Sequence, residues 1–408
     1  MKFKYILLIV LVIIALHLVV VWFFMRGGNV PAAGAEATAG GTEQSIAEAI
    51  AAAKAKAGLK KTQNLTEKDM AFQDRSKPVL STTPRIHTPY RYEYAVRGNI
   101  PGIPSSANAT SGILLDADTR IVLWAKNPER AFPIASMTKL MTLFLAYEDI
   151  VAGKVALDTQ IQVTKAAAKI GGSQVWLDPR ETFSLQDLLM AVSLKSANDA
   201  AYLVGEYLGG GDVAAFIARM NRRAAELGMK NTHYYNPHGL PGTSSRTDNV
   251  SSPADMATLA EYILEHPLLM KWSSTLYADF RTPGTKGHLR MKNHNNLLPG
   301  GRYASPGVDG LKTGFIARSG YCVTVTCLRN GKRMIAMVTG YPTARERDQF
   351  LRQLLSWGYS RADNPAAALA ETRKQASQVR TTTKTAVKKK TAVKRTATKK
   401  TSAKRRQQ

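Results

Sequence analysis

The chain has 408 residues, with 56 Lys and Arg against 30 Asp and Glu, so its formal net charge is +26. This length allows one large domain or two ordinary ones. Its two cysteines, Cys322 and Cys327, lie five residues apart in one strand-like run, which places them on opposite faces about 16 Å apart. Because a disulfide needs Cα atoms within about 7 Å, the composition excludes a disulfide framework, and the spacing does not suit a metal site.

The N-terminus carries a long apolar run, residues 5–25. As a helix this run would span about 31 Å, the thickness of a bilayer core. Lys2 and Lys4 precede it and only Arg26 follows closely, a bias that predicts a cytoplasmic N-terminus. We therefore expect residues 1–26 to be a cytoplasmic tip and a single transmembrane anchor in the plasma (inner) membrane, with the rest of the chain periplasmic or otherwise extracytoplasmic.

The next segment allows an alternative. Ala33-Gly34-Ala35 has the small-x-small pattern of a cleavage site, so a cleavable signal peptide competes with the anchor. Its apolar core would normally be about 7–15 residues, shorter than the run observed. Residues 27–107 contain much Gly, Ala and Pro, which predicts a linker that holds a folded domain away from the membrane.

Residues 108–360 carry the patterns of a globular domain. Residues 112–124 contain two strand-like runs around a turn and predict a β-hairpin. Helical periods dominate residues 136–208, and strand-like runs flank Asn330-Gly331, a typical hairpin turn. A closing helix is expected over residues 343–357. We predict an α+β domain, in which N- and C-terminal strands form one antiparallel sheet around an inserted helical subdomain.

Residues 361–408 are of low complexity. From residue 371 onward they contain fourteen Lys and Arg and one acid, half of the net charge of the chain. With no aromatic anchor, this basic tail is predicted to be disordered. Such a tail could bind DNA, but the predicted anchor places it outside the cytoplasm. Anionic envelope polymers or lipid headgroups are therefore its expected partners, and nucleic acid is disfavoured.

Ser136-Met137-Thr138-Lys139 begins an apolar helical run. Ser136 and Lys139 are three residues apart, so they share a helix face. A serine hydroxyl needs a base to become a nucleophile, and a neutral lysine amine can be that base. Burial or a neighbouring cation shifts a lysine toward the neutral form. Since the helix continues with apolar residues, a buried Lys139 is expected and the pair fits a nucleophile with its base.

Two further motifs follow in the chain. Ser196 and Asn198 lie between two helical runs, where a bend would turn both side chains into a cleft, Ser196 to relay a proton and Asn198 to bond a substrate amide. Lys312-Thr313-Gly314 precedes strand-like sequence, and a strand edge offers backbone groups to an extended peptide. Lys312 and Thr313 suit a terminal carboxylate, and Gly314 allows close approach. Each motif alone is weak; together, in this order, they indicate a serine acyl enzyme.

The region from Ser111 to Tyr359 resembles the D-alanyl-D-alanine carboxypeptidases among the low-molecular-mass penicillin-binding proteins. The resemblance covers nearly the whole globular part. Beyond the three motifs it includes the sequences Gly228-Met-Lys-Asn-Thr-His233, Pro237-His-Gly-Leu240, Asp309-Gly-Leu-Lys-Thr-Gly314 and Trp357-Gly358.

The resemblance implies roles for particular residues. Ser136 would be the acylated nucleophile and Lys139 its base. The backbone amides of Ser136 and Phe315 would form the oxyanion hole. Arg347 would lie near the substrate carboxylate, with Arg345 as the second choice. The resemblance implies neither a metal nor an organic cofactor.

The resemblance also implies a reaction: removal of the terminal D-alanine from peptidoglycan stem peptides through an acyl-enzyme, with β-lactams acylating the same serine. A DD-endopeptidase that cuts cross-links with the same machinery is an alternative. A catalytically idle peptidoglycan-binding module is another, although the intact motifs argue against it. His238 is expected to shape a loop. Because mostly basic repeats follow Trp357, we expect neither the second β-rich domain nor the C-terminal amphipathic anchor that many members carry. It also lacks a Glu-x-x-Leu-Asn segment, which argues against an efficient class A β-lactamase.

Overall fold

The structure, a computed structural model, describes residues 89–377. The predicted anchor, most of the predicted linker and the basic repeats after residue 377 lie outside this range. Within it, no helix combines the length and the apolar character needed to cross a membrane.

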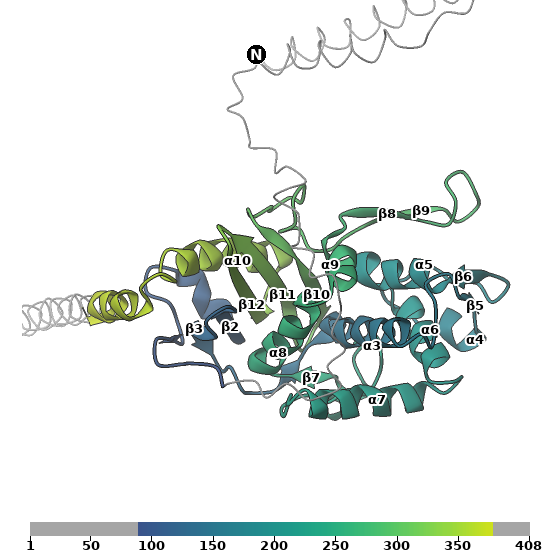
Figure 1. The fold of residues 1–408 in the computed structure, drawn as a ribbon, viewed down its shortest axis with the longest axis horizontal. Helices are drawn as coiled ribbons and strands as arrows, with labels where there is room; N and C mark the ends of the chain where they lie inside the picture. Colours follow the sequence, from purple (N-terminus) through teal and green to yellow (C-terminus); the bar gives the residue numbers. More distant parts are fainter. Residues whose placement is uncertain (1–88, 378–408) are drawn as a thin grey trace, which may run out of the picture. The chain divides into compact units, whose positions relative to one another are not determined.

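One six-stranded sheet organises the domain, with the strand order β1-β3-β2-β12-β11-β10. Its strands are β1 (Val96–Arg97), β2 (Ser111–Asp116), β3 (Ile121–Lys126), β10 (Val308–Ile316), β11 (Gly320–Arg329) and β12 (Lys332–Tyr341). Neighbours are antiparallel except β1, which runs parallel to β3. Because β2 pairs directly with β12, strands from both ends of the domain share one sheet (Figure 1), which confirms the predicted α+β architecture.

Both predicted hairpins are present. β2 and β3 form the first, and β11 and β12 form the second around Asn330-Gly331. Asn330 and Gly331 have φ angles of 50° and 75°, as the type I′ turn requires. The turn residues therefore fix the register of the two longest strands.

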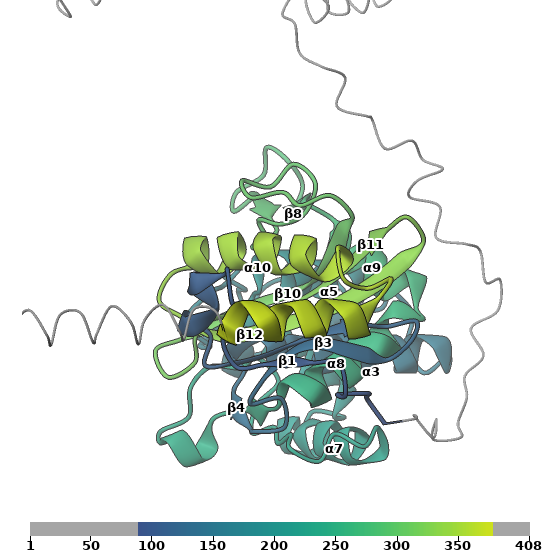
Figure 2. The same ribbon diagram turned by 90° about the vertical axis from the view of Figure 1, so that its left-hand side faces the viewer.

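A helix covers each face of the sheet: α8 (Pro253–Leu264) on one side and α10 (Ala344–Tyr359) on the other (Figure 2). Two apolar clusters result, one beneath each helix. Cys322 lies in the first cluster and Cys327 in the second, both as buried free thiols. The prediction of opposite faces and no disulfide is confirmed.

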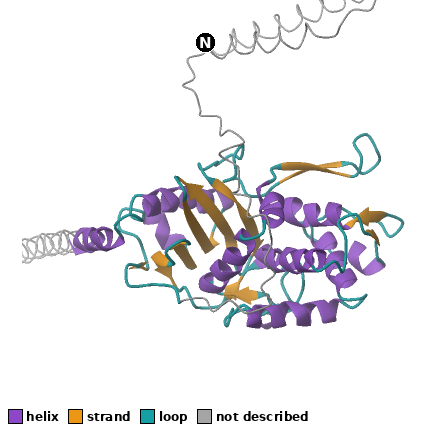
Figure 3. Ribbon diagram, in the orientation of Figure 1, coloured by secondary structure: helices purple, strands orange, loops and turns teal. Residues whose placement is uncertain are grey.

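The inserted block is mainly helical and lies beside the sheet (Figures 1 and 3). Its helices are α3 (Lys139–Val151), α4 (Lys165–Ala168), α5 (Leu185–Met190), α6 (Asn198–Leu208), α7 (Val213–Glu226) and α9 (Pro267–Ser274), with shorter turns η2 (Ala135–Thr138), η3 (Ala191–Lys195) and η4 (Ser245–Thr247). Three small strand pairs complete it: β4 (Phe132–Pro133) with β7 (Val250–Ser251), β5 (Gln160–Gln162) with β6 (Thr182–Ser184), and β8 (Tyr277–Phe280) with β9 (Leu289–Lys292). The β5–β6 pair was not predicted within the helical region.

Side-chain caps fix where several helices begin. Ser184 accepts a hydrogen bond from the Asp187 amide at 3.1 Å, and Ser252 accepts one from Asp255 at 3.1 Å. Thr343 caps α10 in the same way. These residues satisfy amides that the first helical turn leaves without partners.

Two predicted boundaries are wrong. The domain begins earlier than residue 108, because Ile100 and Ile103 in the predicted linker are buried in the second cluster and η1 (Pro104–Asn108) precedes β2. The predicted disordered tail also begins too early, since residues 365–377 are helical. Asn364 caps this helix by accepting from the Ala367 amide, and Leu369 anchors it in the second cluster.

Candidate active site

Ser136 lies in η2, immediately before α3. The residue before it, Ala135, is buried with φ of 47°, an uncommon conformation for a residue with a side chain. Gly239 approaches from the opposite loop: a Cβ there would lie 2.0 Å from the Ala135 carbonyl oxygen and 2.9 Å from the Ser136 nitrogen. Only glycine fits this contact, so the loop and the serine turn hold each other in place.

Lys139 is fully buried at the start of α3, as predicted. Its Nζ lies 3.0 Å from Ser136 Oγ and 2.7 Å from Asn198 Oδ1, and it also contacts the backbone carbonyl of His238. Burial, with a contribution from the charge of Lys312, lowers its pKa well below the usual lysine value. A neutral amine is therefore favoured beside the serine.

The partners of Lys139 orient its lone pair. The Asn198 amide group donates to the Gly171 carbonyl at 2.8 Å, so its oxygen faces Lys139. This oxygen and the His238 carbonyl can only accept hydrogen bonds. Together they occupy both N–H bonds of a neutral amine and leave its lone pair for the Ser136 hydroxyl. The arrangement suits proton transfer from serine to lysine.

Ser196 and Asn198 form the bend that the sequence predicts. The π-helical turn η3 ends at Ser196, whose φ is 61°, and α6 begins at Asn198. The Ser196 hydroxyl is buried and has no hydrogen-bond partner among the described residues. Since buried hydroxyls are almost always bonded in native structures, this group is poised for a partner that arrives with substrate.

Lys312 lies within β10, the strand at one edge of the sheet. The motif was expected to precede strand-like sequence, and the structure instead includes it within the strand. Lys312 is buried, donates to the Thr313 carbonyl at 3.3 Å, and burial lowers its pKa to about 7. A Cβ at Gly314 would lie 2.9 Å from the Ile134 carbonyl oxygen, so this glycine lets β10 pass against the serine turn.

Phe315 and Arg347, two further predicted site residues, differ in their exposure to solvent. Phe315 follows Gly314 on the edge strand, and its half-exposed ring packs against the Tyr321 ring, with the ring centroids 4.2 Å apart. Arg347 is buried at the start of α10, where it pairs with Asp348 at 2.7 Å and donates to the Cys322 carbonyl at 3.1 Å. The oxyanion role of the Phe315 amide and the carboxylate-binding role of Arg347 stay predictions.

His238 shapes the loop opposite Ser136. Its Nδ1 accepts a hydrogen bond from the Leu240 amide at 3.1 Å. Burial, and to a smaller degree the charge of Lys139, lowers the pKa of the ring to about 3. The ring is therefore neutral, and the backbone of His238 is the part that contacts Lys139.

Asn249 is a functional residue that the sequence did not reveal. Its amide group donates to Thr138 Oγ1 at 2.9 Å and to the Asn236 carbonyl at 2.8 Å. Its side-chain oxygen accepts from the amides of Tyr235 and Asn236 at 2.7 and 3.2 Å. Its own carbonyl accepts from Ile134 at 3.0 Å. Asn249 thus joins the serine turn to the loop that carries His238 and Gly239.

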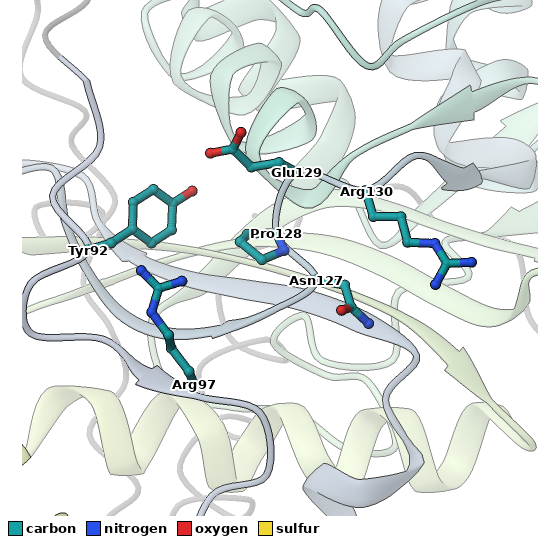
Figure 4. Close-up of a pocket in the computed structure, with 6 residues that line it drawn as sticks. All are labelled: Tyr92, Arg97, Asn127, Pro128, Glu129 and Arg130. Carbon is teal, nitrogen blue, oxygen red and sulfur yellow. The ribbon is translucent and has the colours of Figure 1, made fainter.

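No cluster of metal-ligand side chains accompanies these residues in the described part of the chain. Over residues 89–377, no three His, Cys, Asp or Glu side chains gather as metal ligands would. A cavity of about 340 Å³ lies between β1 and the end of β3 (Figure 4), where the Arg97 guanidinium lies 5.4 Å from the Tyr92 ring centroid. None of the motif residues lines it, so the proposed chemistry does not use it.

The fold and the buried serine–lysine pair have the arrangement expected of a serine acyl enzyme. The family described as D-alanyl-D-alanine carboxypeptidase matches residues 99–343 of the chain. The chain therefore belongs to this peptidase family, as the sequence resemblance predicted.

Individual relatives are named as D-alanyl-D-alanine peptidases or as penicillin-binding proteins. The D-alanyl-D-alanine carboxypeptidase DacF of Bacillus subtilis is 34% identical over 252 residues, which are 62% of this chain and 62% of that protein. A D-alanyl-D-alanine endopeptidase of Pseudomonas aeruginosa is 31% identical over 55% of this chain and 69% of its own. Penicillin-binding protein D2 of Listeria monocytogenes, solved with ampicillin bound, matches with a TM-score of 0.54 at 29% identity, over 62% of this chain and 98% of that one.

Proposed function

We propose that the chain is a serine D-Ala-D-Ala carboxypeptidase that removes the terminal D-alanine from peptidoglycan stem peptides. The observation that carries the proposal is the buried Lys139 amine, whose two carbonyl partners leave its lone pair for the Ser136 hydroxyl 3.0 Å away. Family membership supplies the substrate class.

The reaction proceeds in two steps. Ser136 Oγ attacks the carbonyl of the D-Ala–D-Ala bond while Lys139 takes the hydroxyl proton. The C–N bond then breaks, and the departing D-alanine amine receives a proton through the Ser196 hydroxyl. Water hydrolyses the resulting ester, with Lys139 as the base, and returns Ser136 to its starting state.

The edge strand and Asn198 hold the substrate. Lys312 and Thr313 bind the terminal carboxylate, assisted by Arg347, and the amides of Ser136 and Phe315 stabilise the oxyanion. The stem residues before the scissile bond continue past Phe315. A cavity of about 380 Å³ lies there, lined in part by Phe132 and Arg318.

The proposal is tested by incubating the full chain in detergent with a purified disaccharide pentapeptide and measuring free D-alanine. Release that disappears in Ser136→Ala supports it, and a folded protein that releases none refutes it. A cross-linked muropeptide dimer in a parallel reaction reports endopeptidase activity. β-Lactams are proposed to acylate Ser136 and block both reactions.

We propose that the apolar run at residues 5–25 anchors the enzyme in the plasma membrane with the catalytic domain outside. The proposal rests on the length of the run and on the charges around it. Two reporters fused after residue 377 test this orientation, one active only in the periplasm and one active only in the cytoplasm. Activity of the cytoplasmic reporter would refute the proposal.

We propose that the basic tail binds anionic envelope polymers or lipid headgroups. Its net charge supports attraction that salt screens. Deleting residues 378–408 is expected to leave turnover of a small D-Ala-D-Ala substrate unchanged and to weaken retention on purified cell wall at low salt. Equal retention with and without the tail would refute the proposal.

A further inference from the structure

Trp176 stands out among the described tryptophans. It is 62% exposed, whereas Trp124, Trp272 and Trp357 are buried. Its φ is 54°, a conformation that a bulky side chain adopts only at a cost in free energy. Such strain persists only where the surroundings enforce it, and it clusters at functional positions.

The surroundings of Trp176 do enforce it. Asp199, the residue after Asn198, accepts hydrogen bonds from the amides of Val175 and Leu177 at 3.2 Å each. Arg281 donates to the carbonyls of Val175 and Trp176 at 3.0 and 2.9 Å. The backbone on both sides of Trp176 is therefore clamped, and the clamp directs a large aromatic ring into solvent.

The same loop is bonded to the catalytic motif. The Asn198 amide donates to the Ser173 carbonyl at 2.7 Å, and the Ser173 hydroxyl donates to the Lys195 carbonyl at 2.7 Å. The Lys195 ammonium lies 5.8 Å from the centre of the Trp176 ring. The Trp176 ring and the Lys195 ammonium therefore lie next to each other. Both are held in place by residues that flank Ser196.

The turn that carries Lys195 is linked to the edge strand β10 through α9. The turn η3 that carries Lys195 is tied to α9 by a hydrogen bond from Ser193 to the Trp272 carbonyl at 2.9 Å. α9 in turn packs against the part of β10 that precedes Lys312. The turn that carries Lys195 is therefore joined, through α9, to the strand segment that leads into Lys312.

We propose that Trp176 and Lys195 form a binding platform for a second, neighbouring peptidoglycan stem peptide. This inference rests on the proposed function. A substrate whose terminal carboxylate meets Lys312 and Thr313 has nothing of its own beyond that point. When the scissile amide is itself a cross-link, the departing amine belongs to the neighbouring stem. That stem continues beyond this point, with an aliphatic chain for the Trp176 ring and a carboxylate for the Lys195 ammonium.

The test compares two muropeptides on the full chain with Ser136→Ala, which cannot turn them over. The probes are a purified cross-linked dimer and the matching monomer pentapeptide. Acrylamide quenching of tryptophan fluorescence is measured on Ser136→Ala and on the double variant that also carries Trp176→Phe. The difference between the two quenching curves is the contribution of the exposed Trp176 ring. The expected result is protection of Trp176 by the dimer and none by the monomer.

Separate measurement of KM and kcat for variants that keep Ser136 gives an independent test. Trp176→Asn removes the ring while Asn tolerates the left-handed backbone. We expect a severalfold higher KM for the dimer, with kcat and the KM for the monomer unchanged. Trp176→Phe should restore most of the dimer affinity. Tyr207→Asn, which removes an exposed aromatic ring on α6, is the matched control and should leave the KM for both substrates unchanged.

The failures are distinguishable. If the dimer gives no protection, or the monomer protects equally, the platform does not bind a second stem and the inference is wrong. If Trp176→Asn leaves the dimer KM unchanged, it is also wrong. In both cases the wild type would still release D-alanine from the monomer. If the wild type neither releases D-alanine nor reacts with a β-lactam, the proposed function itself has failed.

Discussion

Replacing Asn249 with alanine should damage stability and catalysis together. The substitution leaves the amides of Tyr235 and Asn236 without the oxygen they share, and Thr138 without its amide donor. Each unpaired buried amide costs about 1–3 kcal/mol, so we expect a loss of roughly 2–5 kcal/mol. For a domain of this size that corresponds to a fall in melting temperature of about 3–8 °C.

The position of Asn249 beside the serine turn also predicts an effect of Asn249→Ala on acylation. Thr138 lies between Ser136 and Lys139, and Ile134 donates to the Asn249 carbonyl at 3.0 Å. Loosening this turn misplaces the nucleophile, and a displacement of about 1 Å can cost on the order of 100-fold in rate. We therefore expect Asn249→Ala to slow acylation by a fluorescent penicillin by at least about tenfold below its melting range.

Asn221→Ala is the matched control. Asn221 on α7 bonds both the amide and the carbonyl of Tyr234 at 2.8 Å, so it supports the same loop from the other side. It has no hydrogen bond to the serine turn. Its loss should lower the melting temperature and leave acylation nearly unchanged. If both variants slow acylation equally, or Asn249→Ala keeps wild-type rate and stability, the bridging role of Asn249 is refuted.

Three further outcomes are expected. Gly239→Ala should abolish penicillin acylation, because its Cβ would overlap the Ala135 carbonyl at 2.0 Å; labelling at the wild-type rate would contradict this. The KM for a D-Ala-D-Ala peptide should rise as pH increases through about 7, where Lys312 loses its proton, and a pH profile of Lys312→Arg, which stays charged, should be flat. His238 has a pKa of about 3 in the folded state, below its usual 6.5, so the unfolded state binds its proton first and stability falls as pH decreases from about 6.5 toward 3. His238→Gln should show a smaller fall in melting temperature over that window, and an unchanged slope would contradict the assignment.

The sequence predicted the parts of the site that short motifs encode. Ser136 and Lys139 share a helix face because they are three residues apart, and the apolar run after them already indicated a buried lysine. The structure brings Asn198 to the same amine at 2.7 Å. The hairpin at Asn330-Gly331 was equally predictable, because its residue types determine its geometry.

Other parts depend on contacts between distant residues and could not be predicted. Asn249 acts on Thr138, 111 positions earlier in the chain, and one asparagine carries no local pattern. Trp176 looks like an ordinary core residue until its neighbours clamp it outward. The helix at residues 365–377 was missed for a different reason: Asn364-Pro365 is a typical helix start, but the basic composition that follows concealed it.

The central claim is that Ser136 is an activated nucleophile whose base is the neutral Lys139. The most direct measurement is labelling of the full chain in detergent with a fluorescent penicillin, with mass spectrometry to locate the adduct. The account predicts one covalent adduct on Ser136, absent in Ser136→Ala and reduced severely in Lys139→Met. A folded wild-type protein without an adduct, or an adduct on another residue, would contradict it.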